Sequence, residues 1–226
     1  MSDYLEIFYD KNNKPYTSYP EKFVSHIFQK YEMKEGQSLL ELGVGRGEHL
    51  RLFNKSGLNV SGLDISKKSK ELCPDMDIRV LDADSEVWPY PDNSFDFVYS
   101  KSFVEHLQQP TKYFLEALRV LKPGGVIITL TPSWQSQYKT FFDDYTHVSP
   151  FTLVSLKNIS FTSSTISSSM GDSGQKLSSN FVCVGSLLNV LDEFFNTNLA
   201  RLSISALTRP INTLTLKIVI ASQSLL

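Results

Sequence analysis

Over the first 132 residues, short apolar runs alternate with segments whose apolar side chains recur at helical spacing. The runs that predict strands are residues 38–43, 59–66, 77–81, 95–100 and 126–130. The segments that predict helices are residues 19–31, 48–54, 66–72 and 111–121, the last ended by a turn at 122–125. This alternation is typical of a parallel sheet with right-handed crossovers, in which ligands bind at the carboxyl ends of the strands.

The pattern weakens after residue 132. Residues 151–158 predict a further helix, and the serine-rich stretch 160–180 predicts loop or weak strand because it has little to bury. Residues 187–195 predict an amphipathic helix, which favours a core or dimer face over a membrane surface or a cap on an apolar ligand. Residues 213–221, TLTLKIVIA, predict a closing strand.

Composition narrows the class of protein. The 226 residues suit one α/β domain, and the net charge of −2 offers no basic field for nucleic acid. Cys73 and Cys183 form no metal-spaced set, which fits a reducing cytosol. The N-terminus does not resemble a signal peptide, and no apolar run approaches the roughly 18 residues of a membrane span. We therefore expect a soluble, cytoplasmic protein with no nucleic-acid partner and no stable membrane insertion.

The stretch SLLELGVGRGEHL, residues 38–50, places a glycine loop between a strand and a helix. Such loops let the backbone approach a ligand closely. A dinucleotide fingerprint starting at Gly43 needs a glycine at position 48, where Glu48 stands, and a carboxylate there repels a pyrophosphate. A phosphate-binding P-loop fails as well, because no Gly-Lys-Ser/Thr follows.

Carboxylates follow three successive predicted strands. Glu41 lies two residues before the first glycine, where a cationic ligand would gain from a negative charge. Asp64 is placed to accept hydrogen bonds from both hydroxyls of a ribose, and Asp82 from an adenine amino group, with the Ala83 amide as a donor to the ring. The pattern indicates a nucleoside with a positively charged tail, such as S-adenosylmethionine.

Four ordered motifs, ELGVGRG, GLDIS, LDAD with VWPYPDNSFDFVYS, and RVLKPGGVIITL, resemble those of class I S-adenosylmethionine-dependent methyltransferases. The nearest branch is similar to small-molecule enzymes of ubiquinone and menaquinone biosynthesis. The resemblance covers residues 36–155. It implies a Rossmann-like three-layer α/β sandwich with a mostly parallel seven-stranded sheet and an antiparallel last strand. It also implies a helical lid or cap at residues 1–35 and a methyltransferase domain at 36–226, with an irregular acceptor-side region at 132–212.

The resemblance also implies roles for individual residues, with S-adenosyl-L-methionine as cofactor and S-adenosyl-L-homocysteine as product. The residues that would surround the methionine part are Glu41, Gly43, Val44, Gly45 and Gly47. Those that would contact the nucleoside are Asp64 at the ribose, Ile65 on the adenine face, and Asp82 with Ala83 at the adenine edge. Ser100 would lie beside the sulfonium.

Several of these residues have a structural alternative. Ile65 could be plain core, Gly47 could only ease helix packing, and Asp82 could cap a turn. Tyr16 and Tyr19 could cover the methyl donor, since aromatic faces attract onium cations, or only anchor the first helix.

Methyl transfer to an oxygen, nitrogen or activated carbon requires alignment, exclusion of water and removal of a proton. His106 and His147 are the candidate bases, each with a structural alternative, and for His106 the structural one is favoured. Asp143, Asp144 and Tyr145 could orient His147 or form a solvated loop. No metal is expected, because the DDYTH segment lacks a clear ligand set.

The acceptor is expected to be a small molecule. Methyltransferases that act on base amines carry Asn/Asp-Pro-Pro-Tyr after the fourth strand, and this chain has Ser-Lys-Ser-Phe there. After HVSPFT the chain departs from the pattern of the similar enzymes, which puts the sixth strand in doubt. Two other functions stay open: a protein that binds the cofactor without catalysis, and a nicotinamide-dependent oxidoreductase. The sequence does not indicate an oligomeric state.

Overall fold

A computed structural model of the chain describes residues 15–170, 180–181 and 219–223. The strands are β1 (Ser38–Leu42), β2 (Asn59–Asp64), β3 (Asp77–Val80), β4 (Phe95–Lys101), β5 (Leu121–Pro132), β6 (Asn180–Phe181) and β7 (Val219–Gln223). The α-helices are α2 (Tyr19–Lys30), α3 (Glu48–Lys55), α4 (Lys67–Leu72), α5 (Pro110–Val120), α6 (Trp134–Gln137) and α7 (Leu153–Met170). Two 3₁₀ turns, η1 (Val104–His106) and η2 (Phe141–Asp143), complete the described elements. The predicted alternation of strands and helices through residue 132 is confirmed.

The strands form one sheet in the order β3-β2-β1-β4-β5, and β6 and β7 both pair with the outer edge of β5. The chain order reverses between β1 and β4, which pair in parallel from Leu39 with Phe97 to Leu42 with Ser100. In parallel sheets the crevice at such a reversal, beyond the carboxyl ends of the strands, is where ligands bind. The topology therefore directs attention to the residues that follow β1, β2 and β4.

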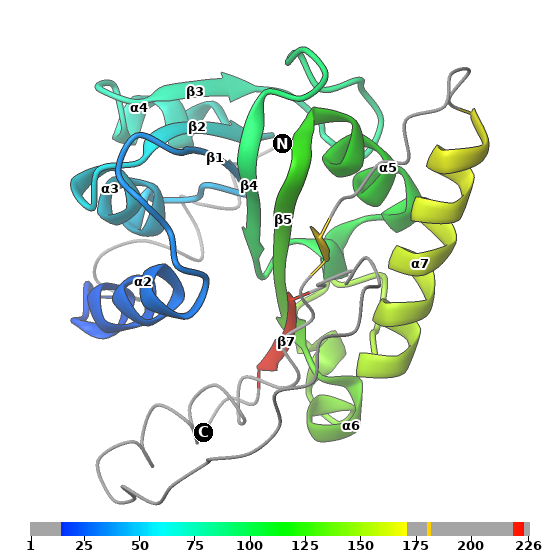
Figure 1. Cartoon of the computed structure of the whole chain (residues 1–226). Helices are drawn as coiled ribbons and strands as arrows, with labels where there is room; N and C mark the ends of the chain where they lie inside the picture. The colour runs from blue at the N-terminus through cyan, green and yellow to red at the C-terminus, as the bar shows by residue number, and fades with distance from the viewer. Residues whose placement is uncertain (1–14, 171–179, 182–218, 224–226) are drawn as a thin grey trace, which may run out of the picture.

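Helices cover both faces of the sheet (Figure 1). Successive side chains of a strand point to opposite faces, so Leu39 packs in the cluster with α2 and α3, whereas Leu40 packs in the cluster with α5 and α7. Both leucines are fully buried. The expected Rossmann-like α/β fold with three layers is present in the described residues.

The expected antiparallel last strand is wrong for the described residues. β7 pairs in parallel with β5, from Ile128 with Val219 to Pro132 with Gln223. β6 occupies the preceding positions of the same edge, at Val126 and Ile127.

β5 begins earlier than the apolar run VIITL indicates. The segment at residues 122–125, expected to be a turn after α5, lies inside the strand. The backbone at Gly124 still has the positive φ typical of a turn, +82°. The pairing of β5 with β4 is irregular at this point and shifts register between Phe95 and Phe97.

The expectation of loop or weak strand over 160–180 is wrong for its first part, because α7 continues to Met170. The hydroxyl groups of Ser160, Thr162 and Ser163 donate to main-chain carbonyl oxygens three or four residues earlier. These bonds satisfy the hydroxyls within the helix, so the serine-rich composition does not end it. No helix among the described residues, α7 included, is long and apolar enough to cross a bilayer.

α2 starts at a proline near its N-terminus and buries Phe23, Val24 and Ile27 in the cluster that also holds β1 and β4 residues. The helix is therefore part of the layered core, and a lid formed by residues 1–35 stays a prediction. The amphipathic helix predicted at 187–195 lies outside the described residues.

Candidate active site

A loop with left-handed backbone joins β1 to α3 at the carboxyl edge of the sheet. Gly43, Gly45 and Gly47 have φ values of +72°, +55° and +74°. The Gly43 amide donates to Leu63 O at 2.9 Å, and the Gly45 amide donates to Asp64 Oδ2 at 2.8 Å. The end of β2 thus fixes the course of the glycine loop.

Glu41 supplies a buried carboxylate directly below this loop. It is 3% exposed, and its Oε2 has no hydrogen-bond partner within the described part of the chain. Burial and the charge of Asp64 raise the pKa of Glu41 well above its usual value, and Lys101 opposes this in part. A buried carboxylate oxygen without a partner is costly, and a bound cation would compensate it.

The histidine beside Glu41 does not supply that compensation. His49 Nδ1 lies 3.9 Å from Glu41 Oε1 and 3.2 Å from the hydroxyl of Tyr99. Burial and the positive charge of Lys101 lower the pKa of His49 to about 3, so the ring is neutral at physiological pH. Sequence reasoning missed His49 and Tyr99, because a histidine and a tyrosine inside regular elements carry no local signal of a polar cluster.

Asp64, at the end of β2, is nearly buried, and both of its oxygens already accept main-chain hydrogen bonds. Oδ2 accepts from Gly45, and Oδ1 accepts from the Ser66 amide at 2.8 Å. Each carboxylate oxygen has a second lone pair, so the ribose role is compatible with these bonds and stays a prediction. Sequence reasoning did not foresee that Asp64 also holds the glycine loop.

The turn after β3 bears out the structural alternative for Asp82. Its Oδ1 accepts from the Asp84 amide at 3.0 Å, and its Oδ2 accepts from the Ser85 hydroxyl at 2.6 Å. Ala83 is buried, and its carbonyl oxygen accepts from Trp88 Nε1 at 3.2 Å. Whether Asp82 and Ala83 also contact adenine is untested.

Three further residues of the predicted site differ in burial: Ile65 is exposed, whereas Val44 and Ser100 are buried. Ile65 is 71% exposed, so its alternative as plain core is wrong, and its packing on adenine stays a prediction. Val44 packs in the core cluster with Leu50, which leaves only its main chain at the loop. Ser100 lies within β4, not after it, and is fully buried against the Tyr113 hydroxyl at 2.9 Å. The expectation that Ser100 follows the fourth strand is therefore wrong, and its place beside the sulfonium stays a prediction.

Gly47 is required for packing. A Cβ at this position would lie 2.2 Å from Cys73 Sγ, in addition to the strain of the positive φ. We expect Gly47→Ala to destabilise the protein by more than the about 1–3 kcal/mol of the backbone alone. Gly36→Ala is the matched control, because Gly36 has a φ of +83° and nothing within 4 Å of its Cβ position. Urea unfolding measures both, and equal losses would contradict the contact with Cys73.

The aromatic residues before and within α2 take different places. The Tyr19 ring stacks on Phe23 at 5.6 Å, which supports its role as an anchor of the helix. Tyr16 is half exposed, and the guanidinium of Arg46 lies 4.4 Å from the centroid of its ring. Because Arg46 belongs to the glycine loop, the segment before α2 lies near that loop. Coverage of a ligand by Tyr16 stays a prediction.

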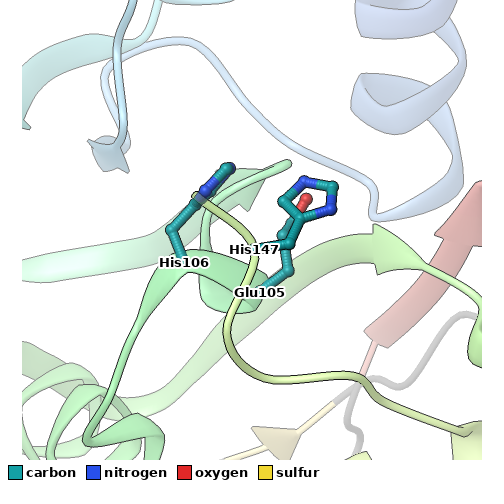
Figure 2. Close-up of side chains that lie close together, drawn as sticks. All are labelled: Glu105, His106 and His147. Carbon is teal, nitrogen blue, oxygen red and sulfur yellow. The ribbon is translucent and has the colours of Figure 1, made fainter. Parts of the chain in front are cut away.

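The two candidate bases lie together with a third side chain that sequence reasoning missed. Figure 2 shows Glu105 and His106 of η1 beside His147, from the loop after η2. One ligand atom from each lies within 4.8 Å of the others. The signal for Glu105 was its place beside His106 in SKSFVEHL, but an acid next to a candidate base is too common to single out.

Hydrogen bonds define the orientation of both histidine rings. His147 Nδ1 lies 2.6 Å from Phe141 O, and His106 Nδ1 lies 2.9 Å from Thr146 Oγ1. Burial and the neighbouring His147 lower the pKa of His106. The bond to Thr146 supports the structural alternative for His106, and the expected catalytic role of each histidine is untested.

Glu105 is fully buried in the same cluster. Its Oε2 accepts from the Thr131 hydroxyl at 2.9 Å, and none of the described residues forms a hydrogen bond with its Oε1. Burial raises the pKa of Glu105 to about 7. Of the acids suggested to orient His147, Asp144 does approach it, with Oδ2 at 3.8 Å from Nε2, whereas Asp143 and Tyr145 are exposed.

The central part of the chain is similar to known methyltransferases. Residues 40–129 match the family described as "Methyltransferase domain". The chain is 32% identical to phosphoethanolamine N-methyltransferase 2 of Caenorhabditis elegans, over 57% of this chain and 31% of that protein. It is also 32% identical to demethylmenaquinone methyltransferase of Renibacterium salmoninarum, over 49% of this chain and 48% of that protein. The chain spans about half, or less, of the length of these curated relatives.

Solved structures show the same fold at lower identity. A SAM-dependent methyltransferase from Archaeoglobus fulgidus is 24% identical with a TM-score of 0.56, over 71% of this chain and 74% of that one. Phosphoethanolamine N-methyltransferase 2 of Haemonchus contortus, in complex with phosphomonomethylethanolamine and S-adenosylhomocysteine, is 20% identical with a TM-score of 0.53. That match covers 70% of this chain and 42% of the other.

Proposed function

Residues 40–129 of the chain belong to the class I S-adenosylmethionine-dependent methyltransferase family, and from this premise we propose that the protein transfers a methyl group from S-adenosylmethionine to a small-molecule acceptor. The observation that carries the proposal is the unpartnered Oε2 of Glu41, a buried carboxylate oxygen beside the glycine loop. The positive charges of the cofactor, its sulfonium and its α-amino group, are what such an oxygen requires.

The residues present fit the cofactor. Glu41 would face the positively charged tail, Asp64 would accept from the ribose hydroxyls, and the exposed Ile65 would provide an apolar surface for adenine. When bound, S-adenosylmethionine supplies an electrophilic methyl group on its sulfonium. The protein aligns the acceptor with that methyl group, excludes water and removes a proton from the acceptor.

His147 is the proposed proton acceptor. Phe141 O can only accept a hydrogen bond, so His147 Nδ1 is the donor and Nε2 is the nitrogen that can take up the proton of the acceptor. The positive charge of Lys101 lowers the pKa values of both Glu41 and Glu105, against the larger effect of burial. His106 is the second candidate, held by Thr146.

The acceptor is an oxygen, nitrogen or activated carbon nucleophile. Relatives at equal identity carry the names of a phosphoethanolamine and of a demethylmenaquinone methyltransferase, and these names alone favour neither acceptor for this chain. Glu41 argues against a nicotinamide dinucleotide, because a buried carboxylate disfavours a pyrophosphate nearby.

The activity test combines calorimetric titration with transfer of a labelled methyl group into cell extract. We expect the protein to bind S-adenosylmethionine and to label one class of small molecules. Binding of S-adenosylmethionine with no labelled product in any extract would instead favour a cofactor-binding protein without catalysis.

Asp64→Ala is expected to weaken binding of S-adenosylhomocysteine by about 1–3 kcal/mol, because the acceptor of the ribose hydroxyls is lost. The variant also loses the bond to the Gly45 amide, so Asp64→Asn, which keeps one acceptor oxygen, is measured beside it. Asp77→Ala, at the opposite end of the neighbouring strand, is the control. Calorimetry gives the affinities, and an unchanged affinity in Asp64→Ala would contradict the ribose assignment.

A further inference from the structure

We propose that Glu105, His106 and His147 form a binding site for a divalent first-row transition-metal ion, with Zn²⁺ as its representative. The three side chains each bring a ligand atom within 4.8 Å of the others (Figure 2). Zn²⁺ binds nitrogen and oxygen ligands at about 2.0–2.2 Å, so a small inward rotation of these side chains closes the set around one ion. Two imidazoles and one carboxylate are a ligand set that Zn²⁺ and Fe²⁺ use in proteins.

The hydrogen bonds of the two histidines favour metal binding. His147 donates its Nδ1–H to Phe141 O at 2.6 Å. The Thr146 hydroxyl donates to Asp144 Oδ1 at 2.6 Å, so its oxygen accepts from His106 Nδ1 at 2.9 Å. Both rings therefore carry their lone pair on Nε2. Donation of the other ring N–H to a carbonyl or a second polar group is the usual support for a metal-bound histidine.

The carboxylate of Glu105 gives a second, independent indication of a cation at this site. It is fully buried, yet its Oε1 has no hydrogen-bond partner among the residues that the structure describes. The Thr131 hydroxyl, 2.9 Å from Oε2, fixes the carboxylate and leaves Oε1 as the donor atom. Burial of a carboxylate with one oxygen unsatisfied is costly, and coordination to a cation removes that cost.

The two histidines are partly exposed to solvent, and main-chain hydrogen bonds fix the segments that carry the three side chains. His106 and His147 are only half-buried, whereas Glu105 lies behind them. The Glu105 carbonyl oxygen accepts from the amides of Val148 and Ser149, both at 2.9 Å, which ties η1 to the loop that carries His147. The sequence alone did not indicate a metal, because Glu105 and His106 lie far from His147 along the chain.

The metal site does not rest on the proposed methyl transfer. An ion bound to His147 Nε2 would take the lone pair that the proposed proton acceptor uses. In the metal-bound protein, an acceptor oxygen coordinated to the ion would be deprotonated more readily without a histidine base.

The experiment titrates the full chain, without an affinity tag and freed of metal, with Zn²⁺ by calorimetry and with Co²⁺ by visible absorption. We expect one equivalent of each ion to bind, with no competition from Mg²⁺, which prefers oxygen ligands. Binding of S-adenosylmethionine is measured in parallel. Protein that binds S-adenosylmethionine but no metal ion would contradict this site alone, whereas protein that binds the metal ion but no S-adenosylmethionine would contradict the proposed function alone. A wild-type protein that takes up neither ion would overturn the proposal, whatever its variants do.

Variants locate the site. Glu105→Gln, His106→Gln and His147→Gln are each expected to weaken Zn²⁺ binding by on the order of 100-fold or more, and Thr131→Val, through Glu105, by about 10- to 100-fold. His26→Gln, on α2, is the matched control and is expected to bind Zn²⁺ as the wild type does. Circular dichroism verifies that each variant is folded. Zn²⁺ binding that survives the three ligand substitutions in folded protein would place the ion elsewhere and overturn the assignment.

Discussion

Turnover is expected to fall by about 10²- to 10⁴-fold when His147 is replaced by alanine, the range typical for loss of a general base. Affinity for S-adenosylmethionine is expected to stay unchanged, because His147 lies in the cluster with Glu105 and His106 and not among the groups beside the glycine loop. The loss should therefore be seen in kcat for the methyl acceptor. The measurement is a steady-state assay of methyl transfer beside a calorimetric titration of the cofactor.

His26→Ala serves as the control for the His147 variant, because His26 lies on α2, away from the cluster. It is expected to keep the kcat of the wild type. An unchanged kcat in His147→Ala, in folded protein, would contradict the role of His147 as the proton acceptor.

Replacement of Glu41 by glutamine is expected to weaken binding of S-adenosylmethionine by about 1.5–3 kcal/mol, which is about 10- to 150-fold. Glutamine keeps the shape of the side chain but removes the negative charge that compensates the cationic cofactor. Because burial disfavours the ionised carboxylate, loss of the charge should leave the ligand-free protein at least as stable as the wild type.

The pH dependence of binding follows from the raised pKa of Glu41. In the ligand-free protein the carboxyl holds its proton well above pH 4.5, and a bound cation favours the ionised form. Cofactor binding therefore releases a proton, and the affinity rises with pH until the pH exceeds the raised pKa. Titrations in two buffers of different ionisation enthalpy measure the released proton.

Glu41→Gln should lose this pH dependence, whereas Glu71→Gln, an exposed substitution on α4, should retain it. Proton release of equal size in the wild type and in Glu41→Gln would show that another group titrates.

The fold up to residue 132 was predictable because each strand is a short apolar run and each helix has one apolar stripe. The later elements were not predictable from these patterns. α7 continues through serines whose hydroxyls bond back to the helix, a local solution that composition does not reveal. The parallel pairing of β7 with the β5 edge, which β6 also occupies, is a property of the whole sheet that the local pattern of residues 213–221 does not carry.

The candidate site was predictable where a residue lies at the carboxyl end of a strand, and it was unpredictable where elements distant in the sequence meet. Glu41 and Asp64 were found because the carboxyl ends of parallel strands share one edge. His49 and Tyr99 meet beside Glu41 from a helix and a strand, and Glu105 meets His147 across separate loops. Ser100 was expected to follow the fourth strand, but β4 runs through Lys101, so Ser100 lies inside the strand and is buried.

The central claim is that the carboxylates at the strand ends hold a nucleoside with a positively charged tail. Calorimetric titration of the purified wild-type chain with S-adenosylmethionine, and separately with NAD, tests it most directly. We expect one equivalent of S-adenosylmethionine to bind with release of a proton, and NAD to produce no binding heat. Binding of NAD without any detectable binding of S-adenosylmethionine would contradict the claim.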